Sequence, residues 1–157
     1  MLDHMQKAPV STFTPLSFDD QHNCFGCGAH NRIGLRLRFF VDEQGAAMST
    51  LRMPRRFQGP HGFVHGGIIA AVLDEAMSKA IHASREGAKV MALTRKMETE
   101  YLRPTPLGAV LTLRGQQDRV EGRKHFCSAT LSNQEGQTLA RGTALFIAIE
   151  RQAEHKH

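Results

Sequence analysis

Hydrophobic and polar residues follow two different periods along this chain, and the change of period predicts its elements. From residue 65 to about residue 84, apolar residues recur at spacings of three and four, which is typical of an amphipathic helix. Small and polar residues occupy another side of the same helix, so a second backbone can approach that side closely. The apolar stripe comprises Ile68, Ile69, Val72, Leu73, Ala76, Met77, Ala80 and Ile81, and the small side comprises Gly67, Ala70, Ala71, Asp74 and Ser78.

The remaining segments show the alternation and turn signals of strands. We expect two strands before the helix, over residues 35–41 and 46–53. Four more are expected after it, over residues 89–102, 109–120, 124–133 and 138–149. Gly87 is expected just past the end of the helix. This order predicts an α+β fold with one long helix packed on an antiparallel sheet.

The length of 157 residues fits one domain. Residues 1–23 are expected to form an extended lead-in, because Pro9 and Pro15 oppose regular structure. The domain is expected over 24–150, with a polar tail over 151–157. No apolar run reaches the roughly 20 residues that span a bilayer, and the first nine residues lack the apolar segment of a signal peptide. Three cysteines give no disulfide framework. A cytoplasmic protein without a membrane partner is therefore expected.

The formal charge of +5 favours an anionic partner, but the basic residues are spread along the chain. Arg103, Arg123 and Lys124 lie near predicted strand ends, where they fit the phosphates of a small molecule and equally well a solvated surface. The chain has no tryptophan and one tyrosine, and aromatic residues do not alternate with basic ones. We therefore expect no nucleic-acid partner.

The start of the helix carries the most specific chemistry in the chain. Residues 62–67 read Gly-Phe-Val-His-Gly-Gly, and a helix that opens on glycines presents unpaired backbone N–H groups at its positive end. Such groups can stabilise a carbonyl oxygen that is becoming an oxyanion. Asp74 follows about two turns later on the same helix. An oxyanion site with a carboxylate can hydrolyse an acyl bond.

These and other residues resemble the hotdog-fold acyl-CoA thioesterases, above all the phenylacetate-pathway type and the mitochondrial thioesterase superfamily type. The resemblance extends over roughly residues 23–149. It rests on the segments Cys24-Phe25-Gly26-Cys27-Gly28, Gln58-Gly59-Pro60, Gly62 to Gly67, Asp74, Thr94, Tyr101-Leu102-Arg103-Pro104 and Val120-Glu121-Gly122-Arg123-Lys124.

The resemblance implies a sheet of about six strands wrapped around the central helix, and a homodimer, with pairing of dimers into tetramers left open. It implies hydrolysis of acyl-coenzyme A to a free acid and coenzyme A, with no cofactor, since coenzyme A is part of the substrate. Asp74 then corresponds to the catalytic carboxylate, Gly66 to the oxyanion N–H, Thr94 to an auxiliary hydroxyl and His65 to the histidine before the glycines. Gly67 is taken as a substrate contact, and Gln58 as a replacement for an asparagine of several relatives. Arg103, Arg123 and Lys124 are then either contacts to the coenzyme A phosphates or solvated strand ends.

Helix geometry makes a separate argument for the dimer. Gly66 and Asp74 are eight residues apart, which is about 12 Å along a helix. Reacting groups must lie about 3–3.5 Å apart. A second, antiparallel copy of the helix, packed on the small side, brings its Asp74 to the first Gly66. We therefore expect two composite sites per dimer.

Other functions remain open at this point. A hotdog hydratase or dehydratase would use His65 with Asp74 to move a substrate proton, and a non-catalytic hotdog protein would only bind acyl-CoA. Glu75 is the rival carboxylate, but it points about 100° away from Asp74 on the helix. Asp74 is either a general base for water or a nucleophile. Fatty acyl and aryl-acetyl substrates both fit.

Cys24 and Cys27, flanked by His22 and His30, have the residue types of a zinc site. The four residues span only nine positions, whereas zinc fingers separate their ligand pairs by about a dozen. We therefore expect a structural turn and no metal. A redox pair is disfavoured because a strand followed by a helix is not expected there. Cys127, in a predicted strand, is expected to be a core residue.

Overall fold

The computed structural model describes residues 14–16, 23–84 and 90–149. Gly87, the tail 151–157 and most of the lead-in lie outside these residues. The described chain forms one α-helix, α1 (Gly66–Ala83), a short 3-10 helix, η1 (Arg55–Phe57), and seven strands. The strands are β1 (Thr14–Leu16), β2 (Phe39–Val41), β3 (Ala47–Leu51), β4 (Met91–Tyr101), β5 (Leu111–Glu121), β6 (Lys124–Ser132) and β7 (Thr138–Ile149).

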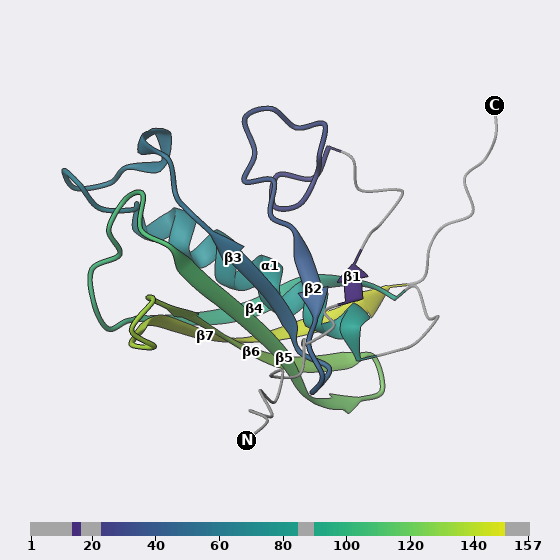
Figure 1. Cartoon of the computed structure of the whole chain (residues 1–157). Coiled ribbons are helices and arrows are strands. Elements are labelled where there is room, and N and C mark those ends of the chain that lie inside the picture. The colour runs from purple at the N-terminus through teal and green to yellow at the C-terminus, as the bar shows by residue number, and fades with distance from the viewer. Residues whose placement is uncertain (1–13, 17–22, 85–89, 150–157) are drawn as a thin grey trace, which may run out of the picture.

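The seven strands form one antiparallel sheet in the order β1-β2-β3-β5-β6-β7-β4. α1 runs across one face of this curved sheet (Figure 1) and packs mainly on β5, β6 and β7. β4 follows α1 in the chain and pairs with β7, which makes β4 an edge of the sheet. A long helix held by a curved antiparallel sheet is the hotdog arrangement that the sequence predicts. Within the described residues, no helix has the length and apolar character needed to cross a membrane.

The apolar stripe of α1 forms the centre of the core, as its spacing predicts. Apart from the half-buried Ile68, every residue of that stripe is buried. Phe146, Leu113 and Leu131 cover the stripe from the sheet. A Cβ at Gly115 in β5 would overlap the backbone of Ala76, so a glycine is needed where the helix lies closest to the sheet. The small side of α1 remains half-buried or exposed.

The N-terminal strands differ from the prediction. Residues 14–16 form β1, within the segment expected to be an irregular lead-in. Pro15 is compatible with a strand because β1 is the outermost strand of the sheet. The strand expected over residues 35–41 is confined to Phe39–Val41. Before it, the N–H groups of Leu35 and Leu37 bond to the loop at Phe25 and Gly26 instead of to a neighbouring strand.

A bulge in β4 decides which of its side chains face the helix. Thr94 pairs with Phe146 and Lys96 pairs with Leu145, so Arg95 is an extra residue in the ladder. In a regular strand, side chains seven positions apart point to opposite faces. Because the bulge adds one residue, Thr94 and Tyr101 both face α1. Both residues contact the segment of α1 in which the sequence predicts chemistry.

Candidate active site

Asp74 and Thr94, two residues singled out by the resemblance, lie together at the middle of α1. The Thr94 hydroxyl donates a hydrogen bond of 2.6 Å to Asp74 Oδ1. Asp74 is half-buried on the small side of the helix, and Thr94 reaches it from the neighbouring edge strand β4. The bond fixes one carboxylate oxygen and leaves the other for a substrate or a water molecule.

Burial raises the pKa of Asp74 above its usual value of 3.8. The hydrogen bond from Thr94 stabilises the carboxylate and opposes this rise, whereas the negative charge of Glu75 adds to it. A carboxylate that is partly desolvated is a stronger base than one in water. The environment of Asp74 therefore suits a general base or a nucleophile.

The N-terminus of α1 holds a backbone donor with no partner among the described residues. The N–H groups of Ile68 and Ile69 both bond to the His65 carbonyl, at 3.0 and 3.1 Å, and the N–H of Gly67 is capped. The N–H of Gly66 makes no hydrogen bond to any other residue that the structure describes. It belongs to the same peptide group as the His65 carbonyl, so the two bonds to that carbonyl polarise it as a donor. Gly66 N–H is thus available for an oxyanion.

His65 caps the helix with its side chain. Its Nδ1 accepts a hydrogen bond of 2.9 Å from the N–H of Gly67, and its backbone is extended. Gln58 supports the same entry loop, because its Oε1 accepts a 3.0 Å bond from the N–H of Gly62. Both residues therefore hold the backbone that presents Gly66.

Comparisons with known proteins identify the family. Residues 61–140, which contain the helix, Thr94 and the loop after β4, match the thioesterase superfamily. The chain belongs to the thioesterase superfamily. The chain is 38% identical over 113 residues to acyl-coenzyme A thioesterase THEM4 of Mus musculus, a match that covers 71% of this chain and 47% of that protein. It spans about half the length of the curated relatives it matches.

Solved structures of the superfamily share the fold. A crystal structure of a thioesterase superfamily protein has a TM-score of 0.68 and 32% identity, covering 76% of this chain and 57% of the other. The E. coli PaaI protein from the phenylacetic acid degradation operon has a TM-score of 0.64 and 20% identity, covering 73% and 80%. The fold and the family that the sequence predicts are thereby confirmed.

Within the superfamily fold, Glu75 does not compete with Asp74 for the role of base. Glu75 forms an ion pair of 3.4 Å with Lys79, which is 2% exposed, and a Cβ at Gly26 would overlap its Oε2. The carboxylate therefore faces the loop of residues 24–27, away from Thr94. Neighbouring residues of a helix point about 100° apart, and this angle separates the Glu75 carboxylate from the Asp74 carboxylate, as the sequence predicts.

One site residue was missed as an individual candidate. Tyr101 donates a hydrogen bond of 2.8 Å to the Gly66 carbonyl, and its ring lies 3.6 Å from the position of a Cβ on Gly66. It is the only tyrosine of the chain and is 52% exposed. A single tyrosine, placed in a segment that carries the family resemblance, was the signal in the sequence that could have identified it. Tyr101 holds the first turn of the helix from the side of β4.

The three predicted phosphate contacts do not lie together in one chain. Arg103 follows β4 at the end of the sheet where Tyr101 contacts Gly66, and its N–H bonds to Leu139. Arg123 and Lys124 form the turn between β5 and β6 at the opposite end, where Lys124 pairs with Ile147. All three basic side chains are exposed. A single chain therefore cannot use them on one small ligand.

We expect replacement of the His65 cap to separate positioning from chemistry. His65→Ala removes the acceptor for Gly67 N–H and should cost about 0.5–2 kcal/mol of unfolding free energy, with a loss of turnover, because Gly66 is no longer held. His65→Asn supplies a good N-cap and should retain stability and most turnover. Urea denaturation and steady-state kinetics measure both. A stable but inactive His65→Asn variant would contradict a positioning role.

Proposed function

We propose that this chain is an acyl-CoA thioesterase, which hydrolyses an acyl-coenzyme A to a free acid and coenzyme A at two sites shared by a homodimer. The observation that carries the proposal is the pair of groups on α1. Gly66 offers an N–H at the helix N-terminus that is unpaired within the described residues. Asp74 follows eight residues after Gly66, and the Thr94 hydroxyl holds its carboxylate. The printed names of the curated relatives, acyl-coenzyme A thioesterases, support the substrate class.

Each group has one part of the reaction. The thioester oxygen accepts a hydrogen bond from Gly66 N–H, which stabilises the negative charge that develops on it. The carboxylate of Asp74 takes a proton from the attacking water or attacks the carbonyl carbon itself. Both routes require the ionised carboxylate. In either route the coenzyme A thiolate leaves and takes up a proton. In the second route, water then hydrolyses the mixed anhydride, which releases the acid and restores the Asp74 carboxylate.

The exposed surfaces support the homodimer. β4 is an eleven-residue edge strand, and within the described residues nothing pairs with its outer side. Large apolar side chains are exposed along it and directly after it, at Met91, Leu93, Tyr101 and Leu102. A long apolar edge strand is a template for pairing with another chain. Antiparallel pairing of two β4 strands would bring the small sides of both α1 helices together.

The positions of the basic residues fit the same arrangement. In an antiparallel dimer, the Gly66 end of one helix meets the Asp74 region of the other. Arg103 of the first chain then lies at the same end as Arg123 and Lys124 of the second. The charges that are separated in one chain gather around each composite site, where they can bind the phosphates of coenzyme A. The proposal includes a cytoplasmic location and leaves pairing of dimers open.

The first measurement is the release of free thiol from a panel of acyl-CoAs that includes acetyl, medium-chain, long-chain and phenylacetyl esters. We expect release of one thiol per acid formed, with the panel ranking the acyl groups. Product analysis by mass spectrometry runs in parallel. Hydration of an enoyl-CoA without thiol release would replace the proposal by a hydratase, and tight binding without turnover would replace it by a binding protein.

A further inference from the structure

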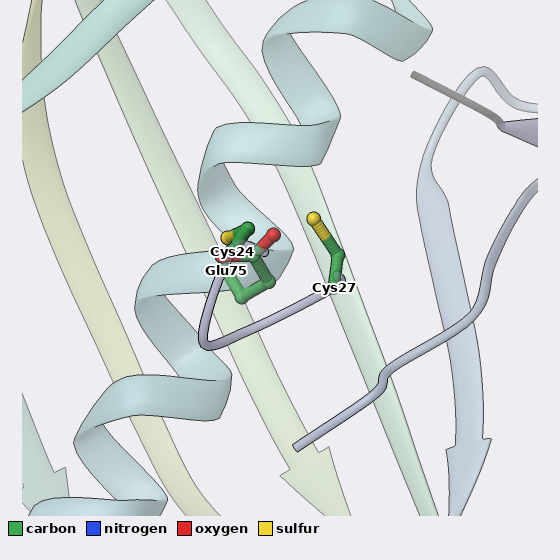
Figure 2. A group of neighbouring side chains, drawn as sticks. All are labelled: Cys24, Cys27 and Glu75. Atoms are coloured by element: carbon green, nitrogen blue, oxygen red, sulfur yellow. The ribbon is translucent and has the colours of Figure 1, made fainter. Parts of the chain in front are cut away.

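The loop of residues 24–27 meets the side of α1 that carries Glu75, about 100° around the helix from Asp74. One ligand atom each from Cys24, Cys27 and Glu75 forms a group in which all the atoms lie within 4.8 Å of one another. Figure 2 shows the two cysteines on the loop and Glu75 on the helix, with the side chains gathered over α1. The sequence predicts a turn and no metal here, because its candidate ligands span only nine positions. Glu75, 48 residues after Cys27, is brought to the loop by the fold.

The two oxygens of Glu75 have different surroundings. Oε1 pairs with the ammonium of Lys79 at 3.4 Å. Oε2 lies against Gly26, where even a Cβ would overlap it, so it points at the centre of the Cys24–Cys27 loop. Gly26 therefore has a clear role, since any larger residue would push the carboxylate away from the two sulfurs. The Glu75 carboxylate also makes a side-chain hydrogen bond with Cys27, so it already contacts one of the two sulfurs as well as the Lys79 ammonium.

We propose that Cys24, Cys27 and Glu75 bind one thiophilic divalent cation, of which zinc is the best fit. Two thiolates and a carboxylate are the ligand types of zinc sites, and three protein ligands leave a fourth position for water. Ligands at about 2.0–2.3 Å from zinc in a tetrahedron lie about 3.5–3.8 Å from each other. The three ligand atoms lie within 4.8 Å of one another, so the distances between them need to shorten by at most about 1 Å. Rotation of the side chains is enough for such a shift.

Charge balance favours the same occupant. On binding, both S–H bonds break, two Zn–S bonds and one Zn–O bond form, two protons leave to solvent, and no electron is transferred. Two thiolates, one carboxylate and the Lys79 ammonium sum to −2, which one Zn²⁺ neutralises. The buried Lys79 thus acts as a fixed counter-charge beside the site, not as a substitute for the metal.

The thiol chemistry disfavours a redox pair. Burial, helped by the carboxylate of Glu75 and opposed by Lys79, raises the pKa of the Cys27 thiol to about 12. Such a thiol is a poor nucleophile for disulfide exchange. A metal ion overcomes a raised pKa because it binds the thiolate directly, at the cost of a strong dependence on pH.

The test is a titration of the reduced, metal-free protein with Co²⁺ and then Zn²⁺. We expect one Co²⁺ per chain, a thiolate-to-cobalt charge-transfer band with the visible bands of tetrahedral Co²⁺, and loss of both on addition of Zn²⁺. Affinity should rise with pH as the Cys27 proton is displaced. Cys24→Ser and Cys27→Ser should abolish the charge-transfer band, and Glu75→Gln should weaken binding on the order of tenfold or more.

Cys127 in β6 is the matched control. Burial raises the pKa of its thiol also to about 12, yet within the described residues it belongs to no such group of ligands, so Cys127→Ala should bind Co²⁺ like the wild type. If the serine variants do not fold, alkylation of the wild type answers the question. Zn²⁺ should protect Cys24 from iodoacetamide under denaturant-free conditions. Absence of the charge-transfer band and of protection, or a Cys24–Cys27 disulfide whose reduced form binds no metal, would overturn the proposal.

Discussion

Replacing Asp74 by Asn should lower the rate of acyl-CoA hydrolysis about 100- to 10 000-fold, the range for loss of a positioned general base. An asparagine has the same shape and can keep the hydrogen bond with Thr94, but it cannot take a proton or attack a carbonyl carbon. The loss should fall on turnover more than on binding of the ester. Steady-state kinetics with the best acyl-CoA of the panel measure it.

The same substitution should leave the protein at least as stable at neutral pH. The pKa of Asp74 is higher in the folded protein than its usual 3.8, so between those two values the folded state holds more protons than the unfolded state. The free energy of unfolding therefore falls as pH rises through that window. At every pH above the folded-state pKa, the protein bears the full free-energy cost of burying the Asp74 charge. The asparagine side chain of the variant has no charge to bury, and thermal unfolding at neutral pH tests this.

Two controls make the result specific. Glu43→Gln removes an exposed carboxylate from the turn between β2 and β3, away from α1 and β4, and should leave turnover unchanged. In the wild type, kcat/KM should fall on acidification through a pKa above 3.8, the protonation of Asp74, and the remaining turnover of Asp74→Asn should lack that limb. An active Asp74→Asn variant would assign the base to another residue.

The sequence predicts the helix and most strands because these elements follow from local periodicity. The buried stripe of α1 follows from residues within a few turns of one another. The order of strands around one helix then limits the fold to a helix on an antiparallel sheet. Asp74 and Gly66 could be predicted for the same reason, since both lie on that helix.

The rest depends on contacts that no local pattern encodes. Whether Thr94 and Tyr101 face the helix depends on one extra residue in β4, and the ladder that accommodates it involves β7, more than 40 residues later. Thr94 was a candidate only through the resemblance. The pairing of β1 with β2 likewise overrides the local effect of Pro15, because the strand lies at the edge of the sheet. Glu75 meets the cysteine loop by tertiary packing alone.

Gly66→Pro should reduce turnover about 100- to 1000-fold, the cost of removing one oxyanion donor, with little loss of stability. Proline is well tolerated at the first position of a helix, and the extended backbone of His65, with φ of −61° and ψ of 135°, is what a residue before proline requires. The substitution therefore deletes the N–H without breaking α1. Gly66→Ala is the matched control, because it keeps the N–H and its Cβ would lie 3.6 Å from the Tyr101 ring, an ordinary contact.

Mixing the two inactive variants tests whether the site is shared between chains. A heterodimer of Gly66→Pro and Asp74→Asn chains contains one site with both defects and one site with neither, if each site combines Gly66 of one chain with Asp74 of the other. Random pairing of equal amounts makes half of the dimers mixed, so about a quarter of the wild-type activity should return. Co-expression with two affinity tags isolates the mixed dimer, which should show about half. If both groups act within one chain, mixing restores nothing, because every chain then carries a defective site.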